Sequence, residues 1–311
     1  MTFAFVFPGQ GSQSVGMMNG FEKSEAVRST FAEASESLQQ DMWQLAQSGP
    51  AESQNLTVNT QPLMLTAGVA VYRAWLEAGG KPPALVAGHS LGEYAAWVAS
   101  GALTFSDALP LVRLRAVAMQ EAVPVGDGAM AAILGLDDAE VRNACVEAAA
   151  GEVVEAVNFN APNQVVIAGH KAAVERATGI AKTKGARRAM LLPVSAPFHS
   201  SLLAPAAERL ARRLASVDIA VPSISVVNNV DAQVVSEPDA IRSVLARQAC
   251  SPVRWVEVIR FMVRSGVTRI VECGPGKVLT GLSKRIDNRV EALALTDHES
   301  LASAREVLGR G

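Results

Sequence analysis

The chain has 311 residues, of which 49% are hydrophobic and 19% charged, and its formal net charge is -2. This composition can supply a large apolar core, and the small net charge gives no reason to expect nucleic acid as a partner. Cys145, Cys250 and Cys273 are too widely spaced for a disulfide framework or a metal cluster. Because the N-terminus lacks a signal-peptide pattern and no run of about 18 apolar residues occurs, we expect a cytoplasmic protein without membrane contact.

The first third of the chain alternates short apolar runs with longer helical patterns. We predict strands at 3–7 and 84–87, each followed by a glycine turn, and helices at about 21–47, 61–78, 91–100 and 105–121. Strands that alternate with helices in this way are typical of an α/β fold.

The pattern changes near residue 127, where strands and helices follow in the order β-α-β-β-α-β of a ferredoxin-like fold. The strands are predicted at 129–134, 153–159, 164–168 and 188–192, and the helices at 137–150 and 170–184. Helix–strand alternation then resumes, with strands at 224–227 and 269–272. We therefore predict one α/β core, residues 1–126 and 195–311, interrupted by a small inserted domain at 127–194.

Gly88-His89-Ser90-Leu91-Gly92 lies between a predicted strand and a predicted helix and matches the G-x-S-x-G pattern of a nucleophile elbow. In such a turn the serine oxygen lies at a helix N-terminus, where the helix dipole favours developing negative charge. Ser90 and Glu93 also fit a capping box, in which the serine only starts the helix. Since capping does not require glycine on both sides, we favour a nucleophile.

A nucleophilic serine needs a base, and the chain has four histidines. The side chain of His89 leaves the backbone in a different direction from that of Ser90. His170 starts a predicted helix, where we expect a surface position, and His298 lies in a polar C-terminal tail. His199 lies in a loop directly after a predicted strand, as catalytic groups commonly do, so it is the preferred base. A purely structural loop histidine is the alternative.

Arg115 lies in the middle of an apolar helical stripe that contains Leu111 and Val112, whereas Arg113 faces the other side. A buried arginine needs an anion. Two partners fit: an Asp or Glu of the chain itself, or a substrate carboxylate that the guanidinium binds in bidentate fashion.

Two other glycine turns follow predicted strands. The turn at 9–13 has serine at position 14 where a dinucleotide fingerprint has its third glycine, so we expect no cofactor there. It can instead offer a backbone N–H to an oxyanion. The turn at 274–277 lacks the phosphate-loop pattern and is interpreted as a plain strand-to-helix turn.

Several motifs together resemble the malonyl-CoA:acyl carrier protein transacylases of bacterial type II fatty-acid synthesis. They are FPGQGSQ at 7–13, GHSLGEY at 88–94, MQEA at 119–122, NFN at 158–160 and GPG at 274–276. The resemblance runs in order to about Arg285. It implies an α/β-hydrolase-like core with a ferredoxin-like insert, and transfer of a malonyl group from coenzyme A to the phosphopantetheine thiol of acyl carrier protein through a malonyl-serine intermediate.

Carried over residue by residue, the resemblance makes Ser90 the nucleophile and His199 the base. It also implies that the side-chain amide oxygen of Gln248 orients the imidazole. The backbone N–H groups of Gln10 and Leu91 are expected to form the oxyanion hole.

The same resemblance implies that Arg115 binds the malonyl carboxylate and that Met119, Asn160 and Phe198 lie at the substrate pocket. Malonyl-CoA and acyl carrier protein are the expected partners, with the coenzyme A thioester as substrate and no bound cofactor. We expect a monomer, because no exposed apolar helix is evident. Since carrier proteins are acidic, local basic clusters are expected to steer docking, although each cluster also fits a solvated face. The candidates are Lys182, Lys184, Arg187 and Arg188; Arg212 and Arg213; and Lys284 and Arg285.

Other functions share part of this pattern. A serine hydrolase or thioesterase would use Ser90 and His199, but Arg115 and Gln248 argue against it. A catalytically silent scaffold that binds acyl carrier protein is disfavoured by the intact serine, histidine and arginine. An acyltransferase of a polyketide or malonate-decarboxylase pathway is barely distinguished by the sequence.

Overall fold

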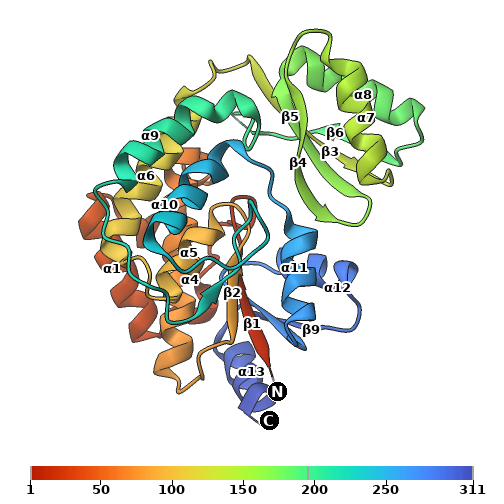
Figure 1. Ribbon diagram of the computed structural model, residues 1–311. Helices are drawn as coiled ribbons and strands as arrows, with labels where there is room; N and C mark the ends of the chain where they lie inside the picture. The colour runs from red at the N-terminus through yellow and green to blue at the C-terminus, as the bar shows by residue number, and fades with distance from the viewer. Residues whose placement is uncertain (1, 195, 310–311) are drawn as a thin grey trace.

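The computed structural model describes residues 2–194 and 196–309. In this part of the chain the strands form a five-stranded parallel sheet and a separate four-stranded antiparallel sheet (Figure 1). The predicted mixed α/β fold is therefore confirmed.

The parallel sheet has the strand order β7-β2-β1-β8-β9. Its strands are β1 (Phe3–Phe7), β2 (Leu85–Gly88), β7 (Ser225–Val226), β8 (Arg269–Cys273) and β9 (Glu291–Leu295). The side chains of the central strand β1 alternate between two buried clusters, with Phe3, Phe5 and Phe7 in one and Ala4 and Val6 in the other. Both faces of the sheet are therefore covered, as expected for parallel strands.

Helices provide the two covering layers. α11 (Trp255–Arg264) and α12 (Val278–Ile286) share the cluster of Ala4 and Val6. Figure 1 shows these two helices on the opposite side of the sheet from α1, α4 and α6. The helices that share the cluster of the three phenylalanines are α1 (Glu25–Leu38), α2 (Met42–Ser48), α4 (Thr57–Glu77), α5 (Gly92–Ala99), α6 (Phe105–Glu121), α9 (Ala204–Leu214), α10 (Pro238–Arg247) and α13 (His298–Gly309). The short α3 (Ala51–Asn55) joins α2 to α4.

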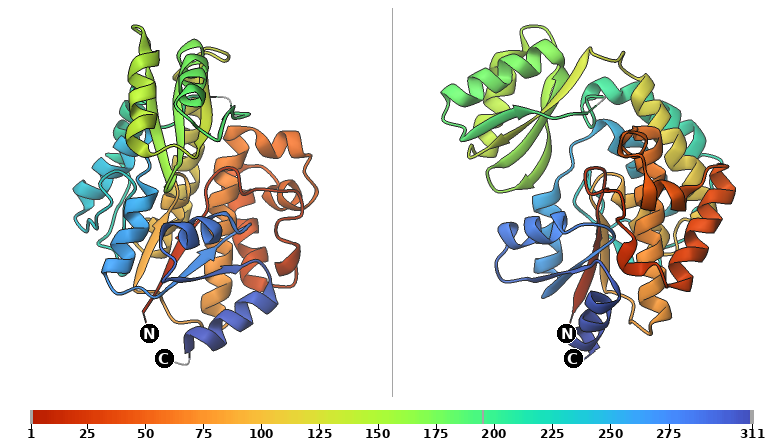
Figure 2. Two further views of the ribbon diagram at one scale, coloured as in Figure 1. Left: turned by 90° about the vertical axis from the view of Figure 1, so that its right-hand side faces the viewer. Right: turned by 180° about the vertical axis from the view of Figure 1, so that it is seen from behind.

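The antiparallel sheet has the order β4-β5-β3-β6 and follows the predicted β-α-β-β-α-β sequence of elements. Its elements are β3 (Gly128–Leu134), α7 (Asp138–Ala149), β4 (Val154–Ala161), β5 (Gln164–His170), α8 (Lys171–Thr183) and β6 (Arg188–Leu191). They enclose a buried cluster of their own. Figure 2 shows this unit at the end of the molecule opposite the two termini. The division into a core and an inserted domain stays a prediction, and its boundary residues 1, 195 and 311 lie outside the described residues.

The structure corrects two expectations. The helix predicted at 21–47 is broken, because Gln39 adopts a left-handed φ of 50 degrees and the side chain of Asp41 caps the new helix α2. The segment expected to be a polar tail forms β9 and α13, which complete the sheet and its covering layer. Among residues 2–194 and 196–309, no helix combines the length and apolar character needed to cross a membrane.

Candidate active site

Ser90 occupies the sharp turn between β2 and α5, with a left-handed φ of 52 degrees. The glycines on either side allow this turn to pack. A Cβ at Gly88 would lie 1.8 Å from the carbonyl carbon of Gly92, and a Cβ at Gly92 would lie 2.0 Å from the carbonyl oxygen of Phe7. Both glycines of the motif are therefore required by close backbone approach, as a nucleophile elbow needs.

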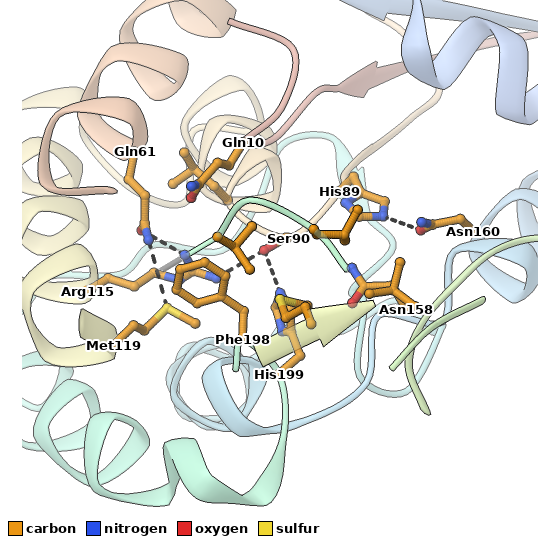
Figure 3. Close-up of a pocket in the computed structure, with 15 residues that line it drawn as sticks. Gln10, Gln61, His89, Ser90, Arg115, Met119, Asn158, Asn160, Phe198 and His199 are labelled. Atoms are coloured by element: carbon orange, nitrogen blue, oxygen red, sulfur yellow. Dashed lines mark hydrogen bonds between the residues drawn. The ribbon is translucent and has the colours of Figure 1, made fainter. Parts of the chain in front are cut away.

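The capping-box alternative for Ser90 is wrong. The N-cap position of α5 is Leu91, and it has no side-chain capping bond. The hydroxyl oxygen of Ser90 instead lies 2.7 Å from Nε2 of His199 (Figure 3). The backbone N–H of Ser90 donates to Oδ1 of Asn229 at 2.7 Å, so the strained turn is held by a residue 139 positions later in the chain.

His199 is 3% exposed, and its Nδ1 lies 2.9 Å from the main-chain carbonyl oxygen of Gln248. Because a carbonyl oxygen only accepts, Nδ1 carries the hydrogen, and Nε2 is left to accept the Ser90 proton. Burial, reinforced by the charge of Arg115, lowers the pKa of His199 to about 3, so the imidazole is in its neutral, basic form.

The prediction that the side-chain amide of Gln248 orients His199 is wrong. The main-chain carbonyl does so, while the buried side chain turns toward Arg115 and Glu93. Sequence reasoning identified the right residue but the wrong oxygen, because a residue motif does not specify which of two carbonyl groups faces the ring.

The other histidines occupy different environments. Nε2 of His89 lies 2.7 Å from Oδ1 of Asn160, on the side of the turn away from His199 (Figure 3). His170 lies half-buried at the surface where α8 begins, and its Nδ1 accepts from the N–H of Val153. His298 begins α13 and packs its ring against Phe21.

Arg115 projects from α6 toward Ser90 and is 1% exposed. Its guanidinium donates to Oε1 of Gln61 at 2.7 Å, to Oε1 of Gln248 at 2.9 Å and to Oγ of Ser90 at 3.3 Å. No ion pair joins it to a carboxylate among residues 2–194 and 196–309. The internal salt bridge that the sequence left open is therefore not formed in the described part of the chain.

These groups border a cavity of about 200 Å³ between the parallel sheet and the antiparallel unit. The predicted pocket residues Met119, Asn160 and Phe198 line it, together with Gln10 and Leu91. The backbone N–H groups of Gln10 and Leu91 make no hydrogen bond within the described residues, so both are free to bind an oxyanion.

Four buried polar residues at the site had no catalytic or binding role predicted from the sequence. Gln61 and Asn158 line the cavity, and Oδ1 of Asn158 has no hydrogen-bond partner in the described chain. Glu93 and Asn229 lie behind Ser90, with side chains linked to Gln248 and to the elbow. Glu93 follows the G-x-S-x-G motif directly and Asn158 begins the NFN motif, whereas no local signal marked Gln61 or Asn229.

The chain is similar to known proteins over nearly its whole length. The acyl transferase domain family matches residues 4–293. The malonyl CoA-acyl carrier protein transacylase of Escherichia coli (strain K12) is 55% identical over 306 residues, which cover 98% of this chain and 99% of that protein. The protein of the same name from Bacillus subtilis (strain 168) is 45% identical over 307 residues, covering 98% and 96%.

Solved structures agree with these matches. The acyl-carrier-protein S-malonyltransferase from Burkholderia pseudomallei 1710b has a TM-score of 0.97 at 63% identity, covering 98% of this chain and all of that one. A malonyl-transacylase in complex with a type II polyketide acyl-carrier protein has a TM-score of 0.97 at 51% identity, covering 99% and 100%. The chain therefore belongs to the acyl transferase domain family and, within it, to the malonyl CoA-acyl carrier protein transacylases.

Proposed function

We propose that this chain transfers a malonyl group from coenzyme A to the phosphopantetheine thiol of acyl carrier protein, through a malonyl ester of Ser90, in fatty-acid biosynthesis. One observation carries the proposal. In the part of the chain that the structure describes, a buried guanidinium donates its hydrogen bonds to neutral side chains only, and it lies beside a serine that is hydrogen-bonded to a neutral histidine. That pairing suits an acyl group with a free carboxylate.

In the first half-reaction, Oγ of Ser90 attacks the thioester carbonyl carbon while Nε2 of His199 takes the hydroxyl proton. The carbonyl oxygen becomes an oxyanion, which the N–H groups of Gln10 and Leu91 stabilise. The carbon–sulfur bond then breaks, His199 returns the proton to the departing sulfur, and coenzyme A leaves as a thiol. The main-chain carbonyl of Gln248 stabilises the protonated imidazole during this step.

In the second half-reaction, the carrier-protein thiol attacks the malonyl ester. His199 takes the thiol proton and then gives it to Oγ of Ser90 as the ester bond breaks. The enzyme returns to its starting state, and the new thioester is on the carrier protein. The same oxyanion site serves both steps, because both attacks occur at the same carbonyl carbon.

Arg115 is proposed to bind the malonyl carboxylate from within the cavity. A carboxylate that enters such a site loses its hydration, and a fixed guanidinium replaces it with two parallel donors. The apolar side chains of Met119 and Phe198 exclude water from the acyl group, while Asn160 supports the turn through its contact with His89.

The finer fold assignment is also a proposal. We infer that the parallel-sheet unit is α/β-hydrolase-like, supported by the strained serine between a strand and a helix. We further propose that malonyl-CoA and acyl carrier protein are the physiological partners, that no cofactor is bound and that the chain acts as a monomer.

The proposal is tested by mixing the chain with labelled malonyl-CoA and the phosphopantetheine form of acyl carrier protein, with Ser90→Ala as the control. We expect label on the carrier protein, at a rate far above that of malonate release, and none with Ser90→Ala. Free malonate as the main product would indicate a thioesterase instead. No turnover, with the carrier protein still bound, would indicate a scaffold.

A further inference from the structure

Glu93 is a fully buried carboxylate whose neighbours all donate hydrogen bonds to it. Its Oε2 accepts from the backbone N–H of Asn229 at 2.9 Å and from Nε2 of Gln248 at 2.8 Å, and its Oε1 accepts from Nε1 of Trp97 at 3.2 Å. Burial, opposed in part by these donors and by the charge of Arg115, raises the pKa of Glu93 to about 7. A proton on the carboxyl would find no acceptor among these groups, so the arrangement favours the ionised form.

Gln248 lies between this carboxylate and Arg115. Its Nε2 donates to Glu93 and to the backbone oxygen of Ser90, while its Oε1 accepts from Nη2 of Arg115 at 2.9 Å. The amide nitrogen therefore faces the anion and the amide oxygen faces the cation. All three side chains are at most 1% exposed, so water cannot take over any of these contacts.

The consequence is electrostatic. If Glu93 touched Arg115 directly, the two would form a contact ion pair, and an incoming carboxylate would have to displace a partner already in place. With the Gln248 amide between the two groups, Arg115 still has the opposite charge of Glu93 nearby, but its N–H groups donate to neutral oxygens. Neutral acceptors are exchanged for a carboxylate far more readily, because hydrogen bonds to ionised groups are about twice as strong.

We propose that Gln248 is a specificity-determining spacer that holds Glu93 one hydrogen bond away from Arg115, so that the charge of Arg115 is compensated in the empty site yet remains available to the carboxylate of an acyl group. This inference rests on the proposed function. Gln61, on the other side of the guanidinium, differs from Gln248 in its second contact. Its Oε1 also accepts from Arg115, but its Nε2 lies 3.9 Å from the neutral sulfur of Met119, where Gln248 contacts a carboxylate.

A double exchange tests the spacer: Glu93→Gln combined with Gln248→Glu. It keeps the composition, the net charge and nearly the side-chain volume, and it moves the carboxylate into direct contact with Arg115. We expect the ratio of kcat/KM for malonyl-CoA to that for acetyl-CoA to fall at least about tenfold. The single change Glu93→Gln keeps a neutral acceptor on Arg115, so its ratio should stay within about threefold of wild type or rise.

The ratio separates the spacer from a structural role, because a damaged site slows both substrates alike. If the double exchange keeps the wild-type ratio, the spacer role is overturned. Should the double variant not fold, Gln61→Glu places a carboxylate on the other side of Arg115 and should lower the ratio too, and an unchanged ratio there would equally overturn the proposal. A wild-type chain without preference for malonyl-CoA would contradict the proposed function itself, so the two failures are distinguishable.

Discussion

Replacing Arg115 with alanine removes the cation proposed to bind the malonyl carboxylate. Arg115 is 1% exposed and lines the cavity, so a carboxylate bound to it is largely removed from bulk water. Removing one partner of a buried charge pair costs about 3–5 kcal/mol. Applied to the transition state, this corresponds to a loss of about 10²–10³-fold or more in kcat/KM for malonyl-CoA.

An acetyl group has no carboxylate, so its transfer should fall much less, and the malonyl-to-acetyl ratio should drop by most of that factor. The ratio is measured from acylation rates with the two thioesters. Arg113→Ala is a matched control on the same helix, because Arg113 faces away from the cavity and donates to Gln40. Arg115→Lys should also lower the malonyl-to-acetyl ratio, since one ammonium cannot reproduce two parallel donors.

A carboxylate-binding role for Arg115 would be refuted if Arg115→Ala lowered the melting temperature while leaving the malonyl-to-acetyl ratio unchanged. That result would assign Arg115 a purely structural role. A similar fall of the malonyl-to-acetyl ratio in Arg113→Ala would show that the helix, rather than the Arg115 guanidinium, controls the ratio.

Three further predictions concern stability and docking. Burial and a neighbouring guanidinium lower the pKa of His199 from 6.5 to about 3, so the unfolded chain binds a proton between these pH values that the folded chain excludes. The stabilising contribution of the neutral ring is therefore complete above pH 6.5 and is lost as pH falls below it. Relative to His199→Gln, the wild-type free energy of unfolding, measured by urea titration, should fall by about 1 kcal/mol between pH ~7.5 and ~5.5. Parallel pH dependences of the two proteins would contradict this. Gly92→Ala places a Cβ 2.0 Å from a backbone oxygen and should lower the free energy of unfolding by about 1–3 kcal/mol or more. The control Gly281→Ala lies in a helix with open space around it and should raise the free energy of unfolding by up to about 1 kcal/mol. Equal melting temperatures of the two variants would argue against the close approach at Gly92. Changing the exposed Arg187 and Arg188 to glutamate should raise KM for carrier protein without slowing acylation by malonyl-CoA, and a change in both half-reactions would exclude docking at this cluster.

Short-range patterns predicted the parts of the molecule that local chemistry determines. The strand Phe3–Phe7 and the helix Phe105–Glu121 follow from continuous apolar patterns and clear turn signals, and the structure has the same bounds. The serine turn was predictable because the required residues are adjacent: its glycines must pass close to neighbouring backbone, and Ser90 lies between them.

The rest of the site depends on contacts between distant segments. Ser90 and His199 are 109 positions apart, and Arg115 and Gln248 are 133 apart, so packing of the whole fold sets their geometry. The apolar stripe indicated that Arg115 is buried, yet it could not show that neutral side-chain amides accept its hydrogen bonds. The position of Glu93 behind Gln248 had no periodic signal, because a carboxylate directly after the serine motif also fits a helix cap.

The most direct test of the account is to locate the acyl group on the enzyme. The chain is mixed briefly with malonyl-CoA, quenched in acid, digested and sequenced by tandem mass spectrometry, with acetyl-CoA in parallel. The account predicts a malonyl ester on Ser90, formed much faster than the acetyl ester and discharged when carrier protein is added before the quench. A malonyl group on another residue, or Ser90 acylated equally by both thioesters, would contradict it.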